Sequence, residues 1–242
     1  MAKLLILLFI CVVACWGKKL PSYITKCKFH DPSMTKCMKD NIPNIKPHLK
    51  EGIKELSVPP LVPFHLAELV IEATKDLVIK LSDLDVFDLD SFDVREMISV
   101  PEEFLGKLDL YFEKIQIIGT YDIDGKILIL PIKGHGPANI TLYQFLVHYE
   151  YIYRPVEING KPHLQLTNGD FQFRAGKISL QLDNLFNGDK ALGEQVNAFL
   201  NENWKEIEDI LRPSITETVK SIIDVIFNSI TNNVALEDLF AL

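Results

Sequence analysis

The longest regular pattern of apolar residues lies near the C-terminus, between residues 189 and 232. Apolar side chains recur there every three or four residues, which places them on one face of an α-helix. Charged residues fall on the other faces, as in a helix packed against a core. The pattern therefore predicts one long helix, kinked at Pro213, with the apolar series in phase from Leu211 to Ile215. The series is Leu192, Val196, Phe199, Leu200, Asn203, Ile207, Ile210, Leu211, Ile215, Val219, Ile222, Ile223, Ile226, Phe227 and Ile230.

The length of this helix predicts the shape of the molecule. At about 1.5 Å per residue it would extend roughly 60 Å. A compact domain of similar chain length has a radius of gyration of only roughly 17 Å. We therefore expect an elongated molecule in which the rest of the chain lies along the helix.

Between residues 66 and 182 the apolar period shifts towards two, with many β-branched and aromatic residues. Turns are predicted at Asp124-Gly125, Asn159-Gly160 and Asn168-Gly169. This stretch should form a meander of long antiparallel strands. The predicted fold class is α+β, with a strongly curved antiparallel sheet wrapped around the long C-terminal helix.

A short amphipathic helix should precede the sheet. Pro43 would lie in its first turn, followed by Ile45, Leu49, Ile53 and Leu56 on one face. The prolines between residues 58 and 63 force extended backbone and should end it.

One strand shows what the inner face of the sheet carries. Along residues 140–153, alternate positions hold Tyr143, Phe145, Val147, Tyr149, Tyr151 and Tyr153, and this set should face inward. Ile127, Leu128, Ile129 and Leu130, then Ile178, Leu180 and Leu182, add aliphatic surface, and Phe171 and Phe173 add two rings. This surface is either an ordinary packed core or the lining of an apolar cavity with tyrosine hydroxyls as its polar groups.

The N-terminus reads as a secretory signal peptide. Residues 1–17 contain one cation, Lys3, followed by an apolar run too short to span a bilayer comfortably. We predict cleavage after Gly17, with cleavage after Cys15 and an uncleaved anchor as alternatives. Residues 18–242 then form a single domain, because no linker or low-complexity segment divides them.

The charge and the cysteines narrow the possible partners. The formal net charge is −8 and no basic cluster occurs, so we expect neither nucleic acid nor stable membrane association. In a secreted chain Cys27 and Cys37 most simply pair in a disulfide. His30 is near them, but a zinc site lacks further ligands.

No motif indicates an enzyme. His135 lies between glycines, but no nucleophile with a recognisable partner accompanies it. The aspartates between residues 83 and 93 lack the glycine and terminal glutamate of a calcium loop. We therefore expect no catalytic residue, metal or cofactor. Asn139-Ile140-Thr141 is a possible glycosylation site if Asn139 is exposed.

Several motifs together resemble the takeout and juvenile hormone binding protein family of insects. They are residues 182–189, residues 200–204, Gly52-Ile53 with residues 58–61, residues 119–121 and residues 130–136, which together with Cys27 extend over the mature chain. The resemblance implies the tubular lipid-binding fold, in which the curved sheet and long helix enclose a hydrophobic tunnel. It also implies a secreted carrier of a terpenoid such as juvenile hormone, a fatty acid or a quinone-like lipid.

Differences from the family pattern refine this expectation. The chain lacks the second cysteine pair of the hormone-binding branch, so it looks more like the takeout branch, which argues against juvenile hormone itself. We expect an extracellular monomer that binds its ligand in the tunnel. The alternative is a ligand-independent interaction protein or receptor ligand with the same fold. The expected tunnel lining is Tyr111, Tyr121, Leu128, Leu130, Tyr143, Phe145, Val147, Tyr149, Tyr151, Phe171, Phe173, Leu180, Phe199, Asn203 and Ile207.

Overall fold

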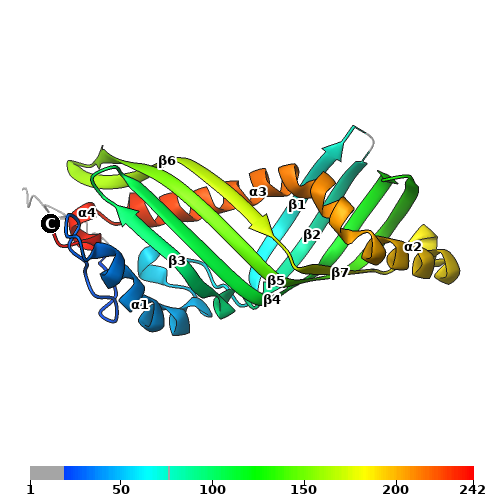
Figure 1. The fold of residues 1–242 in the computed structure, drawn as a ribbon, viewed down its shortest axis with the longest axis horizontal. Coiled ribbons are helices and arrows are strands. Elements are labelled where there is room, and N and C mark those ends of the chain that lie inside the picture. The colour runs from blue at the N-terminus through cyan, green and yellow to red at the C-terminus, as the bar shows by residue number, and fades with distance from the viewer. Residues whose placement is uncertain (1–18, 76) are drawn as a thin grey trace, which may run out of the picture.

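The computed structural model describes residues 19–75 and 77–242, so the predicted signal peptide lies outside the described residues. The molecule is elongated, with a long helix running along a bent sheet (Figure 1). The elements are α1 (Met34–Leu49), η1 (Lys54–Leu56), β1 (Phe64–Thr74), β2 (Leu77–Phe87), η2 (Leu89–Ser91), β3 (Asp93–Val100), β4 (Leu105–Ile127), β5 (Leu130–Ile158), β6 (Lys161–Arg174), β7 (Lys177–Leu182), η3 (Phe186–Gly188), α2 (Lys190–Glu202), α3 (Trp204–Asn233) and α4 (Leu236–Leu239).

The predicted antiparallel sheet is confirmed, and its two longest strands hold it together. The strand order is β1-β2-β4-β5-β6, with β3 paired to β4 and β7 paired to β5. The first part of β4 pairs with β3 and its last part with β2, while β5 pairs first with β7 and then with β6. The sheet therefore has two halves that share β4 and β5.

Along a strand, residues alternate between the inner and outer faces of the sheet, and this alternation shifts by one residue where the two halves meet. Along β5 the buried residues are even-numbered up to Ala138 and odd-numbered from Tyr149 onwards. Between them Gln144 has a φ of 51°, a left-handed conformation that interrupts regular alternation. Along β2 a similar change occurs at Asp83, whose φ is 50°. These irregularities let one continuous strand bend while apolar side chains stay on the inner face.

The long helix is present, with a break that the sequence analysis did not predict. α2 and α3 meet at Asn203, while Pro213 lies inside α3. The Asn203 side chain donates a hydrogen bond to the Phe199 carbonyl, a local alternative to helix continuation that asparagine favours. Pro213 is exposed, so the carbonyl that it leaves without an amide partner can be hydrated. Pro213 therefore does not end the helix, and the kink expected there stays a prediction.

Helix side chains cover the free edge that β6 and β7 present. Asn197 pairs with the amide and carbonyl of Leu182, and Asn201 pairs in the same way with Leu180. Further along, Asn228 accepts from the Leu166 amide at 3.0 Å. Ser214 donates to a carbonyl of β1, the opposite edge strand. The sheet is thus open. Its two edge strands do not pair with each other, and α3 lies between them.

The N-terminal helix differs from its prediction. α1 begins at Met34 and ends at Leu49, so Pro43 lies inside it rather than in its first turn. Ile53 forms a short bridge with Val58 after the helix has ended. The disulfide between Cys27 and Cys37 is confirmed, and it joins α1 to the segment that pairs with Ala241 near the C-terminus.

Only one of the three predicted turns forms. Asn159-Gly160 connects β5 to β6 with both residues at positive φ, as a two-residue hairpin requires. Asp124-Gly125 and Asn168-Gly169 instead lie inside β4 and β6. The β4–β5 turn consists of Leu128 and Ile129.

Candidate functional site: the interface between the long helix and the sheet

Two apolar surfaces face each other in the wider half of the molecule, and we call this region the central interface. The sheet contributes rings and aliphatic side chains from β5 and β6, and α3 contributes one stripe. The members are Phe145, Val147, Tyr149, Tyr151, Phe171 and Phe173 on the sheet and Ile215, Val219, Ile223 and Phe227 on α3.

The helix side of the central interface is only partly buried. From Asp209 to Ile230 no residue of α3 is fully buried, although its apolar stripe faces the sheet. On the sheet, Phe145, Val147 and Tyr151 also retain accessible surface. Interiors normally pack densely, with few voids larger than a water molecule. Apolar side chains of both layers therefore retain accessible surface.

Two tyrosine rings lie against glycines of neighbouring strands. A Cβ added at Gly106 would meet the Tyr151 ring at 2.2 Å, and one added at Gly169 would meet the Tyr149 hydroxyl at 2.5 Å. The rings stack on each other with centroids 5.4 Å apart. The glycines thus allow both rings to lie close to the sheet, which limits how far they extend towards α3.

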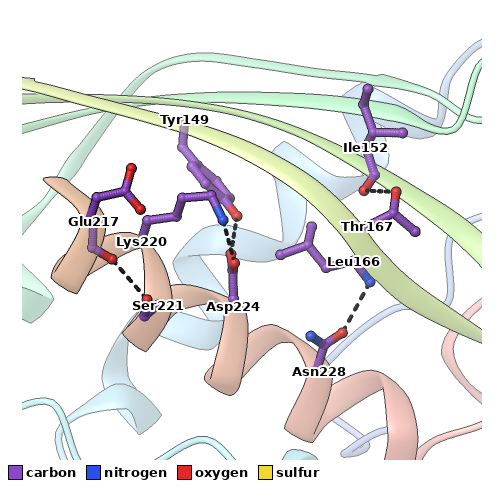
Figure 2. Close-up of polar contacts among 9 residues, drawn as sticks. All are labelled: Tyr149, Ile152, Leu166, Thr167, Glu217, Lys220, Ser221, Asp224 and Asn228. Carbon is purple, nitrogen blue, oxygen red and sulfur yellow. Dashed lines mark hydrogen bonds and ion pairs between the residues drawn. The ribbon is translucent and has the colours of Figure 1, made fainter.

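A polar cluster joins the central interface to α3 (Figure 2). The Tyr149 hydroxyl donates to Asp224 Oδ1 at 2.9 Å, and Lys220 Nζ donates to Asp224 Oδ2 at 2.7 Å. Burial is the larger cause that raises the pKa of Tyr149, and the hydrogen bond to Asp224 is the second. Tyr149 therefore remains a neutral donor whose hydroxyl is already engaged.

A buried carboxyl lies at the start of α3, contrary to the expectation of a solvent-facing glutamate. Glu208 is 5% exposed, and its Oε1 lies 3.3 Å from Arg212 Nη2. Burial raises the pKa of Glu208, and the opposing effect of Arg212 is smaller. Arg212 also donates to the Phe173 carbonyl, and this hydrogen bond links α3 to β6.

The opposite end of the molecule is filled by a second apolar cluster, which we call the packed end. Its fully buried members include Leu77, Leu84, Tyr121, Ile132 and Leu200. The Tyr121 hydroxyl donates to the Asp183 carbonyl at 2.8 Å, and burial raises the pKa of this tyrosine to about 12. Tyr121 is therefore part of a dense core with its polar group satisfied.

The sequence and the fold both match known proteins. A sequence model of the haemolymph juvenile hormone binding protein family matches residues 6–241. The chain belongs to this family. The circadian clock-controlled protein daywake of Drosophila melanogaster and that of Drosophila yakuba are each 26% identical to it over 231 residues, covering 91% of this chain and 88% of each relative.

A solved structure supports the same fold. Takeout 1 of Epiphyas postvittana superposes with a TM-score of 0.77 and 21% identity, covering 90% of this family member and 99% of that chain. At this identity the match establishes the architecture of a curved antiparallel sheet with a long C-terminal helix. In the described parts of the chain, no helix is both long and apolar enough to cross a membrane.

In this juvenile hormone binding protein family member, the residues expected to line a tunnel fall into three groups. The central interface contains Phe145, Val147, Tyr149, Tyr151, Phe171 and Phe173. The packed end contains Tyr121, Leu130, Leu180, Phe199 and Ile207. Outside both lie Tyr111, Tyr143, Leu128 and Asn203, of which Asn203 forms the helix break and Leu128 the β4–β5 turn.

Two of the predicted inward tyrosines point outward. Tyr143 is 38% exposed because the phase change at Gln144 places Leu142, not Tyr143, among the inner residues. Tyr111 donates to Glu113 on the exposed face, with the Arg95 guanidinium 4.5 Å from its ring centre. Their placement inside a tunnel is therefore wrong. Asn139, in the possible glycosylation motif, is exposed and accepts from Gln116.

The list of expected lining residues omitted the helix side of the site. Ile215, Val219, Ile223 and Phe227 belong to the apolar series of the long helix, so the periodic pattern could have identified them. Lys220 and Asp224 are spaced one turn apart, but nothing in the sequence indicates that Tyr149 contacts them.

Proposed function

We propose that this chain is a secreted carrier that binds a small hydrophobic ligand at the central interface. The observation that carries the proposal is the partly accessible apolar stripe of α3 between Ile215 and Phe227, which faces an equally apolar sheet. Each ligand methylene buried there would contribute about 0.8 kcal/mol. Affinity would therefore depend mainly on ligand length, as suits a terpenoid, a fatty acid or a quinone-like lipid.

We propose Tyr151 as the residue that binds the polar group of the ligand. The hydroxyls of Tyr121, Tyr149 and Tyr111 have protein partners, and Tyr143 faces outward. Among the described residues, none forms a hydrogen bond with the Tyr151 hydroxyl. Burial raises the pKa of Tyr151 to about 12, so it would offer a neutral donor to a ligand oxygen.

The family and the N-terminal sequence both support secretion of this carrier. The family is named for a haemolymph protein, and the predicted signal peptide at residues 1–17 supports export to the same kind of fluid. The mature chain, residues 18–242, would act as a monomeric single domain. Juvenile hormone enters only as one candidate among terpenoids, because the second cysteine pair expected of the hormone-binding branch is missing.

Native mass spectrometry of the secreted protein, followed by organic extraction, tests the proposal first. A co-purifying lipid or terpenoid of defined mass would support a carrier and identify the ligand class. The apo protein should then bind the neutral fluorescent probe N-phenyl-naphthylamine, and farnesol, palmitate or a short-chain ubiquinone should displace it.

A pair of variants on one helix locates the site. Ile223→Trp fills the central interface and should weaken probe binding at least tenfold, since lost contacts of about 1.4 kcal/mol suffice for that change. Val225→Trp is the matched control, because Val225 is 69% exposed on another face of α3. Equal probe binding by both variants, with no extractable ligand, would favour the ligand-independent interaction protein instead.

A further inference from the structure

The acceptor sequence for N-linked glycosylation, Asn139-Ile140-Thr141, lies on β5 and is the only Asn-X-Ser/Thr sequence in the chain. Ala138 is 3% exposed and belongs to the packed end, so its neighbour Asn139 points to the opposite, outer face of the sheet. Thr141 lies on the same face, two residues further along the strand. Asn139 and Thr141 are thus both directed away from the long helix, which runs along the inner face (Figure 1).

The side chain of Asn139 is held in an orientation that leaves its nitrogen free. Gln116 Nε2 donates to Asn139 Oδ1 at 3.1 Å. In the parts of the chain that the structure describes, Asn139 Nδ2 has no hydrogen-bond partner. An N-linked sugar is attached through this nitrogen and leaves the oxygen able to accept a hydrogen bond. The contact with Gln116 is therefore compatible with a modified Asn139.

The surface next to Asn139 is uncharged and partly apolar. Asn139 lies between Ile118 on β4 and Gln181 on β7, and Ile118 is 42% exposed. The other neighbours that share this face on β4, β5 and β7 also carry no charge. They are Gln116, Thr120, Pro137, Thr141 and Ser179.

Charged pairs cross the strands elsewhere on the outer face. Lys133 on β5 pairs with Asp124 on β4, and Lys80 on β2 pairs with Glu68 on β1. Such charges keep a sheet surface soluble and discourage contact between copies. Ile118 lacks this protection on the side of Asn139. A bulky hydrophilic group on Asn139 would supply it by other means.

We propose that Asn139 carries an N-linked glycan, which covers Ile118 and the uncharged surface around it. The glycan lies on the outer face, so it makes no contact with a ligand at the central interface. This modification takes place in the secretory pathway. The proposal therefore rests on the proposed secretion of the chain, but not on its function as a carrier.

Mass spectrometry of the protein secreted by insect cells tests the modification. The full chain is expressed with its own residues 1–17, and protein from the medium is treated with peptide N-glycosidase A. The treatment should lower the mass and leave aspartate at position 139. Asn139→Gln and Thr141→Ala should each abolish the mass loss. Thr141→Ser keeps the acceptor sequence and should retain it.

A second form of the protein separates failure of the glycan from failure of secretion. In this form a well-characterised secretion signal replaces residues 1–17. If only this form reaches the medium, the predicted signal peptide is wrong, and the glycan is then tested on the second form. An unmodified Asn139 in secreted protein of either form would overturn the proposal.

The covering of Ile118 has its own test. Asn139→Gln and Thr141→Ala should both raise the apparent molecular mass in static light scattering at high protein concentration, because both expose Ile118. Adding Ile118→Thr to either variant should return the mass to that of the glycosylated protein. Binding of N-phenyl-naphthylamine should stay unchanged in all of them. Unchanged scattering without the glycan would overturn the covering of Ile118, and weaker probe binding would overturn the separation of the glycan from the ligand.

Discussion

The packed end and the central interface share strand β5 and the apolar series of the long helix, yet they are filled differently. Leu200, on α2, is 2% exposed among close-packed side chains. Ile223, further along the same apolar series, remains partly accessible opposite the aromatic face of β5 and β6. Amphipathic spacing thus specifies which side of a helix faces inward. How completely that side is buried depends on the curvature of the sheet and the size of the facing residues.

The largest expected difference between the two regions is in the cost of removing a side chain. Leu200→Ala should lower the free energy of unfolding by about 3 kcal/mol, because it leaves a cavity in a dense core. Ile223→Ala should cost about half as much, since its surroundings are already incompletely filled. Urea unfolding measures both values. Equal losses would mean that the central interface is packed as tightly as the other end.

The second difference concerns how the helices hold the sheet edge. Asn197 is buried and makes two hydrogen bonds with Leu182, whereas Asn228 makes one with Leu166. Asn197→Ala should therefore lower the free energy of unfolding by about 2 kcal/mol, and Asn228→Ala by about 1 kcal/mol. Hydrogen exchange of the Leu182 and Leu166 amides would report each edge directly. Faster exchange at both edges in either variant would contradict independent attachment.

The sequence predicted which segments of both regions form strands and helices better than it predicted how their side chains pack. The period of two and the helical series identified the sheet, the long helix and its inner stripe. The face of Tyr143 was missed because the phase change depends on Gln144, a residue with no conformational preference that would reveal it. The β4–β5 turn was missed because Asp124-Gly125 is a stronger local signal than Leu128-Ile129. Pairing between strands in the folded chain determined both the face of Tyr143 and the place of the β4–β5 turn.

A third test adds volume instead of removing it. Leu81→Phe inserts atoms into the packed end and should lower the free energy of unfolding by about 1.5 kcal/mol. Val147→Phe adds a ring at the central interface, where accessible space should accommodate it at a cost below about 0.5 kcal/mol. Thermal unfolding of the two variants gives the comparison. A larger loss for Val147→Phe would show that the space between the layers is already occupied by protein.

The smallest expected effect is on alkaline stability, and it concerns Tyr121 at the packed end and Tyr151 at the central interface. Burial raises the pKa of each to about 12, above the value of about 10 in an unfolded chain. Below pH 10 both states are protonated, and this contribution to stability is fully present. As the pH rises from 10 to 12 the unfolded state loses its protons first, so the contribution is lost. Tyr121→Phe and Tyr151→Phe should each reduce that loss, because phenylalanine does not titrate.

The same titration distinguishes a filled core from a ligand site. A ligand at the central interface would displace water from around Tyr151 and accept its hydrogen bond, which should raise the pKa of Tyr151 further. Tyr121 is 1% exposed with its hydroxyl bound to Asp183, so its titration should not respond. Ultraviolet difference spectra of Tyr121→Phe and Tyr151→Phe, with and without farnesol, would separate the two residues. A farnesol-dependent shift that persists in Tyr151→Phe would place the ligand away from this hydroxyl.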